Sequence, residues 1–308
     1  MSLATRFAEL CRLELPLPGA GRTVERWRAL AGIATEDLAL VKLAESHFDA
    51  LAILAELGAG ELHRPGQRWA VWAAEPPDAR LALGRAATGR KAWCSGADLV
   101  THALVTGWTL DNQQQLAAIT LAEAGARPDD SAWRAVGMGR VHTPDLFFDA
   151  VPFTPVGAPG QYVDRPGFWH GGAGIAACWY GGAVALAKAV AAKAARSDEP
   201  HLRAHLGEID VALRGLQALL RETAAGIDAQ PDLIDSTAVL RVRAAADQAC
   251  RQVSDAAARA LGAGPLCRDA GVAQHFADLA VFIRQTHAER DLAELAAGLI
   301  ERGTGWVL

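Results

Sequence analysis

A short segment, Gly89–Ala97, brings together residue types that can hold a planar cofactor. A turn at Gly89 leads into a strand that ends in Trp93, Ser95 and Gly96. An indole can lie against a planar ring, a hydroxyl can donate a hydrogen bond to a ring acceptor, and glycine permits close backbone approach. The alternative for Trp93 is an ordinary core side chain beside a turn. The segment therefore indicates a candidate cofactor contact and leaves a packing role open.

A second polar segment, Arg284–Asp291, interrupts an apolar helical pattern near the C-terminus. Thr286 and Glu289 form a capping-box pattern, which predicts that one helix ends near Gln285 and another starts at Thr286. A polar joint of this kind can present groups to a pocket, and it can also be a plain connection between helices. A catalytic base must be unprotonated and close to the proton that it removes, and Arg284 cannot be unprotonated at neutral pH.

Composition and charge exclude several classes of protein. The 308 residues carry a net charge of −5 without a long basic run, which gives no electrostatic footprint for nucleic acid. The five cysteines include no CxxC pair, and the histidines form no HxH or HExxH pattern, so we expect free thiols and no metal site. Met1–Leu15 lacks the apolar core of a signal peptide, and Gly171–Leu186 is shorter than the ~20 residues of a spanning helix. We therefore expect a cytoplasmic protein without a membrane segment, in which Gly171–Leu186 belongs to a buried core helix.

The pattern of apolar and turn residues changes twice along the sequence and predicts three domains. Residues 1–64 have helical spacing, with a helix start at Thr35. Residues 65–165 hold short apolar runs between turn residues, which predicts an antiparallel β domain. Residues 166–308 return to long amphipathic patterns, which predicts an antiparallel helix bundle. We expect strands within Trp69–Ala74, Leu99–Thr106, Gln115–Leu121 and Leu146–Phe148, and bundle helices near Ile175–Ala195, Leu202–Ile227 and Leu233–Leu261.

Four partial motifs, taken together, resemble those of the acyl-CoA dehydrogenase superfamily over about residues 35–302. They are similar to the family's "[TS]-E-P" turn, its "G-x-K-x-W-x-[ST]" strand, the strand pair before its last domain, and its C-terminal glycine turn followed by "Y-E-G-T". The matching residues are Glu75 and Pro76, then Gly89, Lys91, Trp93 and Ser95, then Val136–Gly139 with Asp145–Pro152, and finally Gly262, Gly264, Thr286 and Arg290.

The resemblance implies both a fold and a cofactor. The fold would be α+β and acyl-CoA dehydrogenase-like, with short N-terminal helices, a central antiparallel β-barrel domain and a C-terminal four-helix bundle. The protein would be an FAD-dependent oxidoreductase that oxidises an acyl-CoA or related small substrate by hydride transfer to flavin, with an electron-transfer flavoprotein as its partner. Trp93 and Ser95 would contact the isoalloxazine ring with help from Thr286, and Gly262 and Gly264 would lie near the pyrophosphate. The family's bundle packs across a two-fold axis, so the resemblance also implies a homo-oligomer.

The sequence departs from the family where the family keeps its catalytic glutamate. That position falls on Arg284, so the base is unassigned. His287 and Glu289 lie nearby, but on a helix they would point about 100° and 300° around from Thr286, so both cannot face one cofactor. Two alternatives follow. One is a non-catalytic, flavin-free relative that acts as a binding or structural partner, and the other is an oxygen-using flavin monooxygenase of the same fold.

Overall fold

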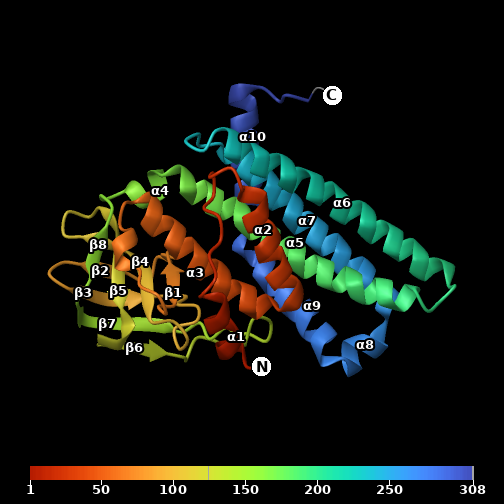
Figure 1. The fold of residues 1–308 in the computed structure, drawn as a ribbon, viewed down its shortest axis with the longest axis horizontal. Coiled ribbons are helices and arrows are strands. Elements are labelled where there is room, and N and C mark those ends of the chain that lie inside the picture. The colour runs from red at the N-terminus through yellow and green to blue at the C-terminus, as the bar shows by residue number, and fades with distance from the viewer. Residues whose placement is uncertain (124, 307–308) are drawn as a thin grey trace. The chain divides into compact units, whose positions relative to one another are not determined.

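The computed structural model describes residues 1–123 and 125–306, which divide into two compact units (Figure 1). The sheet unit contains Met1–Leu15, Lys42–Ala135 and Gly139–Phe168. The helical unit contains Pro16–Val41, Val136–Met138 and the chain from Trp169 onward. This division cuts across the three ranges expected from the sequence, because the first and third helices contribute to the same unit as the strands.

Three helices precede the first strand. They are α1 (Leu3–Leu10), α2 (Thr23–Glu36) and α3 (Leu38–Glu56), followed by the 3-10 turn η1 (Gly60–Leu62). The expected helix start at Thr35 is wrong by two residues. Asp37 Oδ1 accepts hydrogen bonds from the backbone N–H groups of Ala39 (2.8 Å) and Leu40 (3.2 Å), so Asp37 caps α3. Thr35 lies in the last turn of α2, where its hydroxyl donates to the Ala31 carbonyl at 2.9 Å.

The sheet unit contains an eight-stranded sheet in the order β6-β7-β3-β2-β4-β5-β8, with β1 paired to β4. The expected runs at residues 69, 99, 115 and 146 correspond to β1, β4, β5 and β7. The strands are β1 (Trp69–Trp72), β2 (Leu81–Leu83), β3 (Ala87–Lys91), β4 (His102–Thr109), β5 (Gln114–Thr120), β6 (Ala126–Asp129), β7 (Asp145–Val151) and β8 (Thr154–Val156), with the 3-10 turn η2 (Leu121–Glu123) after β5.

The expected antiparallel barrel is corrected in two respects. First, β1 and β2 pair with successive parts of β4 and run parallel to it, at Trp72↔Val105 and Ala82↔Trp108. Because the chain passes from β1 to β2 along one side of β4, the two strands share one direction. Second, among the described residues no pairing joins the edge strands β6 and β8, so the sheet is open.

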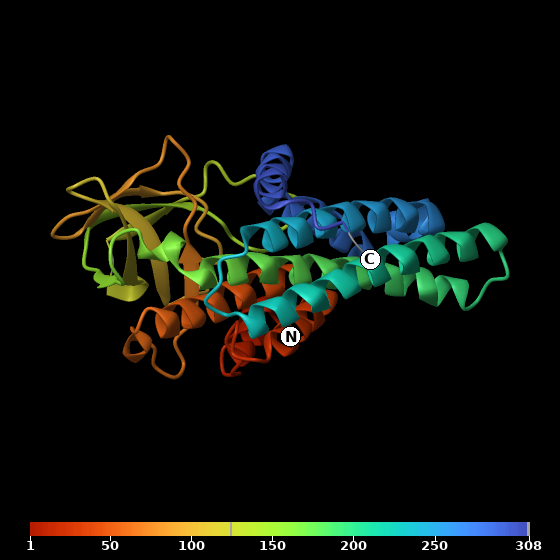
Figure 2. The same cartoon turned by 90° about the horizontal axis from the view of Figure 1, so that it is seen from above.

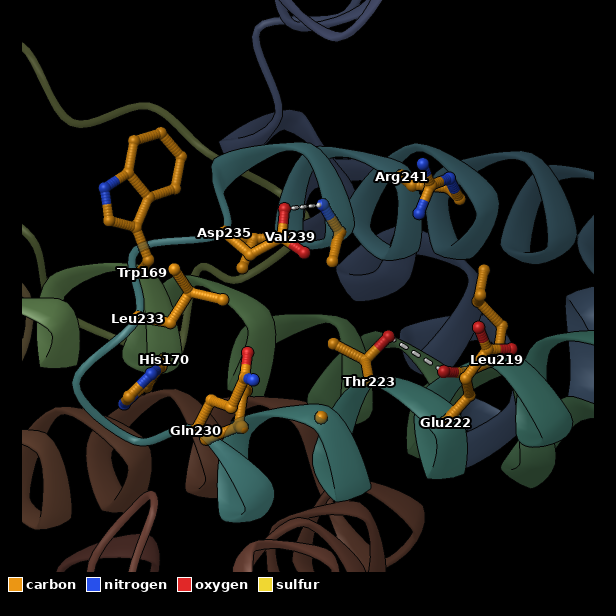
Figure 3. A pocket seen from close by; sticks show the side chains of 13 residues that line it. Trp169, His170, Leu219, Glu222, Thr223, Gln230, Leu233, Asp235, Val239 and Arg241 are labelled. Atoms are coloured by element: carbon orange, nitrogen blue, oxygen red, sulfur yellow. Dashed lines mark hydrogen bonds between the residues drawn. The ribbon is translucent and has the colours of Figure 1, made fainter. Parts of the chain in front are cut away.

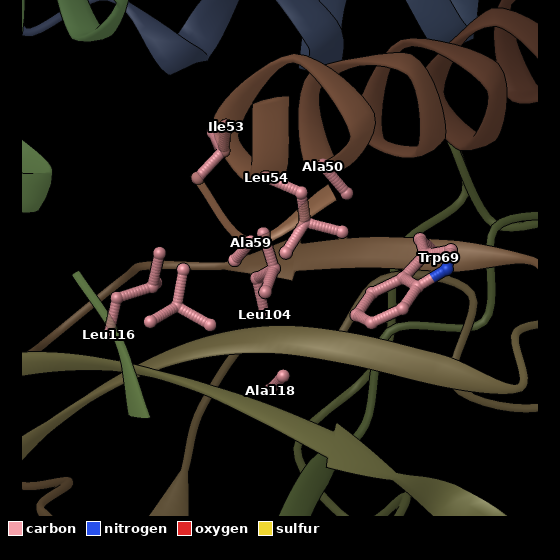
Figure 4. Packing of buried hydrophobic residues seen from close by; sticks show 9 residues of the cluster. Ala50, Ile53, Leu54, Ala59, Trp69, Leu104, Leu116 and Ala118 are labelled. Atoms are coloured by element: carbon pink, nitrogen blue, oxygen red, sulfur yellow. The ribbon is translucent and has the colours of Figure 1, made fainter. Parts of the chain in front are cut away.

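Helix α3 covers the sheet and also completes the hydrogen bonding of β1. Ala50, Ile53 and Leu54 of α3 pack against side chains of β1, β4 and β5 in one buried cluster (Figure 4). The N–H groups of Trp69 and Val71 donate to His47 Nδ1 (3.1 Å) and Ser46 Oγ (2.8 Å) of the same helix. These two bonds satisfy donors on the side of β1 away from β4, where an unpaired buried donor would be costly.

The helical unit is built from long helices that lie side by side (Figure 2). Its C-terminal part begins with α5, and α6 and α7 pack along each other. This arrangement confirms the expected C-terminal helical region. After the short helix α4 (Gln161–Asp164), which belongs to the sheet unit, the helices are α5 (Pro166–Ala194), α6 (Pro200–Ala229), α7 (Ser236–Leu261), α8 (Ala263–Arg268), α9 (Ala270–Phe282), the 3-10 turn η3 (Ile283–Gln285) and α10 (Glu289–Arg302).

Helix α5 is the buried core helix that the sequence predicted. Within the described residues it is long and apolar enough to cross a membrane, but half of its most apolar window is buried inside the protein. Trp179, one of its central residues, is fully buried. Helix α7 holds α5 through polar contacts as well. Cys250 Sγ donates to the Trp179 carbonyl at 3.4 Å, and Lys193 Nζ donates to the Ala260 and Leu261 carbonyls at the end of α7 (2.8 and 3.1 Å).

Candidate functional site

The sheet unit places Trp93 directly after β3, with its indole exposed. The Trp93 side chain is 56% exposed, and its backbone has a left-handed φ of 61°, which is unusual for a bulky residue. Its ring meets Trp133 edge to face, at a centroid distance of 6.2 Å and an interplanar angle of 89°. A strained backbone that exposes an aromatic ring is typical of a binding position rather than of core packing. The core alternative for Trp93 is therefore wrong.

The backbone on either side of Trp93 is held by its neighbours. The Cys94 and Gly96 N–H groups donate to the carbonyls of Pro144 (3.0 Å) and His142 (2.7 Å). Gly96 has a φ of +73°, and a Cβ there would lie 2.4 Å from Leu43 Cδ2 of α3. The glycine is thus required by its backbone conformation and by its packing against α3, and this differs from the cofactor approach suggested by the sequence.

A donor without an acceptor belongs to the ring that packs against Trp93. Trp133 Nε1 is buried and has no hydrogen-bond partner. The single proton of the Thr143 hydroxyl lies within reach of the Val141 carbonyl at 2.8 Å and of Ser95 Oγ at 3.3 Å. A planar ring with several acceptors along its edge, such as an isoalloxazine, fits an exposed aromatic face beside such polar groups. These features of the sheet unit fit a flavin.

Glu75 has a structural role that the sequence did not reveal. Its carboxylate lies 3.5 Å from Lys91 Nζ, which also donates to the Thr106 carbonyl and hydroxyl at 2.8 Å each. The Lys91 side chain is almost fully buried, and burial lowers the pKa of its ammonium group while Glu75 acts in the opposite direction. The pair ties the Glu75 loop to β3 and β4. Glu75 is therefore not the plain exposed turn that was one option from the sequence.

In the helical unit, the polar joint near residue 285 is held by a half-buried arginine. Arg243 of α7 donates from Nη1 to the Gly172 carbonyl and from Nη2 to the Gln285 carbonyl, both at 2.8 Å. Its guanidinium lies 5.0 Å from the centre of the Trp179 ring. Burial lowers the pKa of Arg243, and the negative charge of Asp291 partly opposes that effect. Arg243 therefore fixes the end of η3 against α5 and α7.

Arg284, the residue at the position of the expected base, is engaged in an ion pair. Its Nη2 lies 2.9 Å from Asp247 Oδ1 on α7. Asp247 is buried and accepts a second contact from Arg251 at 2.7 Å through Oδ2. Both carboxylate oxygens of Asp247 are thus committed to guanidinium groups. This position can hold charge in place, but it offers no proton acceptor.

The capping expected from Thr286 and Glu289 is made by another acid. The helix break at Gln285 is confirmed, but α10 begins at Glu289 itself. Thr286 Oγ1 donates to Asp291 Oδ2 at 3.2 Å, and the His287 N–H donates to the same oxygen at 2.9 Å. Asp291 takes the role assigned to Glu289 because Glu289 is already within the first turn of the new helix.

His287 and Asp291 form a side-chain pair at this joint. His287 Nδ1 lies 3.1 Å from Asp291 Oδ1, and the imidazole is 62% exposed while Asp291 is buried. Burial alone would raise the pKa of the Asp291 carboxyl group. The hydrogen bonds and positive charge of His287, together with the hydrogen bond from Thr286, outweigh this effect, so the pKa of Asp291 is lowered overall. A carboxylate of this kind stays ionised and can orient an imidazole whose Nε2 remains free for proton transfer. The sequence reasoning left the base unassigned, although the spacing of four residues between His287 and Asp291 is a usable helical signal.

Gly262 and Gly264 lie at the other end of α7 from this joint. Arg243, which binds the Gln285 carbonyl, precedes Gly262 by 19 residues of helix, or roughly 28 Å at ~1.5 Å per residue. A Cβ at either glycine would meet nothing within 4 Å. Within the helical unit, Thr286 and the two glycines therefore do not form one cluster.

A separate cavity of about 230 Å³ opens among α5, α6 and α7 (Figure 3). Trp169 and His170 line one part of it, and Glu222 and Arg241 line another. Its walls mix acidic, basic and apolar groups, so its chemistry does not select one ligand class. None of the five residues expected to bind a flavin, Trp93, Ser95, Gly262, Gly264 and Thr286, lines it. Among the described residues, no group of three or more metal-ligating side chains is close enough to hold an ion.

Comparison with known proteins identifies this arrangement of helices and sheet. Residues 162–283 match the model of the acyl-CoA dehydrogenase C-terminal domain. The structure of butyryl-CoA dehydrogenase from Megasphaera elsdenii resembles the chain with a TM-score of 0.83, at 13% identity, over 96% of this chain and 89% of that one. Residues 162–283 are thus similar to the acyl-CoA dehydrogenase C-terminal domain, and the chain has an acyl-CoA dehydrogenase-like fold. The resemblance read from the partial motifs is therefore confirmed.

Two further solved structures are similar in fold, with TM-scores slightly below that of butyryl-CoA dehydrogenase. TdsC from Paenibacillus sp. A11-2, a dibenzothiophene monooxygenase solved with FMN and indole, has a TM-score of 0.78 at 18% identity and covers 89% of this chain and 82% of its own. A nitrososynthase from Micromonospora carbonacea var. africana has a TM-score of 0.79 at 19% identity and covers 96% and 88%. No curated protein sequence matches this acyl-CoA dehydrogenase-like chain.

Proposed function

We propose that the protein is a flavin-dependent monooxygenase, in which one atom of molecular oxygen enters a small substrate and the other leaves as water, with the two electrons supplied by reduced flavin that an external reductant regenerates. The observation that carries this proposal is the ion pair between Arg284 and Asp247 at 2.9 Å. An acyl-CoA dehydrogenase needs a proton acceptor where Arg284 stands, and Arg284 cannot serve as one. The FMN complex of the structurally similar monooxygenase TdsC also supports a flavin-dependent monooxygenase.

The residues of the chain would hold the cofactor as follows. A bound flavin would supply the redox chemistry with oxygen. Trp93, whose ring is exposed, would lie against the flavin ring, and the Ser95 hydroxyl would donate to a ring acceptor. Thr286 is a third proposed contact, which rests on the resemblance alone. FMN is the first candidate because TdsC contains it, and FAD, with Gly262 and Gly264 near its pyrophosphate, is the second.

His287 is the residue that we propose for proton transfer. Asp291 accepts from Nδ1 and keeps the imidazole in one orientation, so Nε2 can exchange a proton with the substrate or a reaction intermediate. The lowered pKa of Asp291 means that this carboxylate orients His287 and does not itself titrate near neutral pH. His287 is exposed, as a group that must meet a substrate needs to be.

The setting of the proposed enzyme follows from the same features. We propose a small-molecule substrate, a cytoplasmic location and a homo-oligomer. Helix α10 supports the oligomer, because Leu292 and Ile300 are 42% and 86% exposed on it. The acyl-CoA dehydrogenase reading, with an electron-transfer flavoprotein as partner, remains the second candidate because butyryl-CoA dehydrogenase has the TM-score of 0.83. The exposed ring of Trp93 and the unpartnered Trp133 Nε1 beside it weaken the flavin-free alternative.

Two reactions, one anaerobic and one aerobic, distinguish the monooxygenase from the acyl-CoA dehydrogenase. Protein loaded with FMN is mixed anaerobically with a series of acyl-CoA thioesters, and the flavin absorbance is followed. A second sample, reduced with dithionite, is mixed with ¹⁸O₂ and a panel of heteroaromatic substrates. We expect no bleaching in the first experiment and ¹⁸O in the product of the second, with His287→Ala lowering the yield and His201→Ala leaving it unchanged. Bleaching by any acyl-CoA at catalytic rates would contradict the proposal.

A further inference from the structure

A second, smaller cavity in the helical unit has a lining of one chemical character. It measures about 120 Å³ and lies among α2, α5 and α6. Its polar lining comes from Trp27, Arg28, Tyr180, Gln217 and Arg221, and includes no carboxylate. The rest of the wall is apolar and comes from side chains such as Val24, Ala177 and Leu220. A donor-rich half and an apolar half thus face the same space.

Both arginines of this cavity lack a counter-ion of their own. Within the described part of the chain, neither Arg28 nor Arg221 makes an ion pair. The nearby acid that senses the charge of Arg28 is Glu25, and Glu25 is bound by Arg22 through a salt bridge and hydrogen bonds. Two guanidinium groups at one opening, without a facing carboxylate, form a binding surface for an anion.

A neutral donor of the cavity is also available. Gln217 Nε2 donates to the Tyr180 hydroxyl at 3.2 Å, so the proton of that hydroxyl is free to bind another acceptor. Gln217 Oε1 is occupied by Arg214 at 3.2 Å, which fixes the orientation of the amide. The Trp27 side chain is 3% exposed and contributes its ring to the cavity wall. Its Nε1 is shielded from solvent and faces Gly174 of α5, outside the cavity lining.

The size of the cavity limits the ligand. A cavity of ~150 Å³ in another protein holds benzene, so a space of about 120 Å³ can hold an apolar group of roughly four or five carbon atoms. An inorganic oxyanion would leave the apolar wall of Val24, Ala177 and Leu220 without a partner. A short-chain carboxylate would place its hydrocarbon against that wall and its charge at the arginines.

We propose that this cavity is a binding site for a small aliphatic carboxylate, separate from the flavin-binding residues. Arg28 and Arg221 bind the carboxylate, and Tyr180 donates to it. The side chain of Trp27 forms part of the pocket, and the aliphatic tail packs against α5 and α6. The site joins three helices of the helical unit, so occupancy stabilises their packing.

Pentanoate is a suitable probe because its four-carbon tail fits the cavity, and pentanamide is its neutral counterpart. Protein labelled with ¹⁵N-tryptophan gives one indole N–H signal for each tryptophan, and Trp27→Phe identifies the signal of Trp27. We expect pentanoate to shift that signal saturably, and pentanamide or sodium chloride at equal ionic strength to leave it in place. Arg28→Gln and Arg221→Gln should each raise the Kd about tenfold, the loss typical of a charge-assisted hydrogen bond.

Arg203→Gln is the matched control for Arg221, because Arg203 lies on the same helix, is exposed and stands outside the cavity lining. It should leave the Kd within about twofold, a difference of ~0.4 kcal/mol. Three results would overturn the proposal: equal binding of pentanamide, a Kd unaffected by both arginine substitutions, or inorganic phosphate binding more tightly than pentanoate. Because none of these measurements involves flavin, the test is independent of the proposed monooxygenase activity.

Discussion

Arg243→Met should destabilise the helical unit more than any other single arginine substitution on α7. The change keeps most of the side-chain volume but removes the donors to Gly172 and Gln285 and the contact with Trp179. A hydrogen bond to a charged donor contributes ~1.5–3 kcal/mol and a desolvated cation–π contact up to ~2 kcal/mol. The Gln285 carbonyl can be rehydrated in part, and burial of the guanidinium already costs free energy, as its lowered pKa shows. We therefore expect a net loss of about 3 kcal/mol in the free energy of unfolding.

Urea denaturation followed by far-UV circular dichroism measures this loss as a shift of the midpoint at constant slope. Arg243→Lys should lose about half as much, because a single ammonium keeps the charge but cannot donate to both carbonyls in the same geometry. Arg241→Met on the same helix should stay within ~0.5 kcal/mol, since Arg241 is exposed. If Arg243→Met also stayed within that range, the role of Arg243 in fixing the joint would be refuted.

Two further predictions concern the sheet unit. Burial, and to a smaller extent the charge of the nearby His63, lowers the pKa of His47 from 6.5 to about 4. The unfolded chain therefore binds a proton at His47 more readily than the folded protein does. As the pH falls from about 6.5 to 4, the free energy of unfolding should decrease by ~3 kcal/mol. His47→Gln should flatten this dependence in urea titrations at several pH values, and a curve as steep as that of the wild type would contradict the assignment. Gly96→Ala should lower the unfolding free energy by at least ~2 kcal/mol, because its Cβ would meet Leu43 and its φ is positive. Gly66→Ala, which has a φ of +88° but open space, should cost only ~1 kcal/mol, so equal losses at the two glycines would exclude the clash.

Local patterns in the sequence predicted the helices and strands better than their connections. The leucine spacing of α6 and the apolar run at Trp69 each reflect contacts along one element, so they are visible in the sequence. The sequence predicts a cap at Thr35 because this is the first suitable hydroxyl before the helical pattern. That prediction is wrong because α2 continues through Thr35, and Asp37 caps α3. The parallel pairing of β1 with β4 joins residues such as Trp69 and His102, and no local pattern encodes that distance along the chain.

The candidate site shows the same limit. The motif that contains Trp93 and Ser95 could be recognised because its residues are adjacent, and the structure adds Trp133 as a neighbour from a distant loop. The ion pair between Arg284 and Asp247 joins residues 37 positions apart. The sequence showed that an arginine replaces the expected base, but only the fold shows what that arginine binds.

The most direct test of the central claim is flavin binding by the purified protein. The protein is incubated with excess FMN, unbound flavin is removed, and the visible spectrum is recorded. The account predicts retained flavin at about one per chain, with Trp93→Ala weakening the Kd by roughly fivefold to tenfold, as expected for a loss of ~1 kcal/mol or slightly more in stacking. Trp306→Ala, at another exposed tryptophan, should leave binding unchanged. A protein that retains neither FMN nor FAD would contradict the account and favour a flavin-free binding partner.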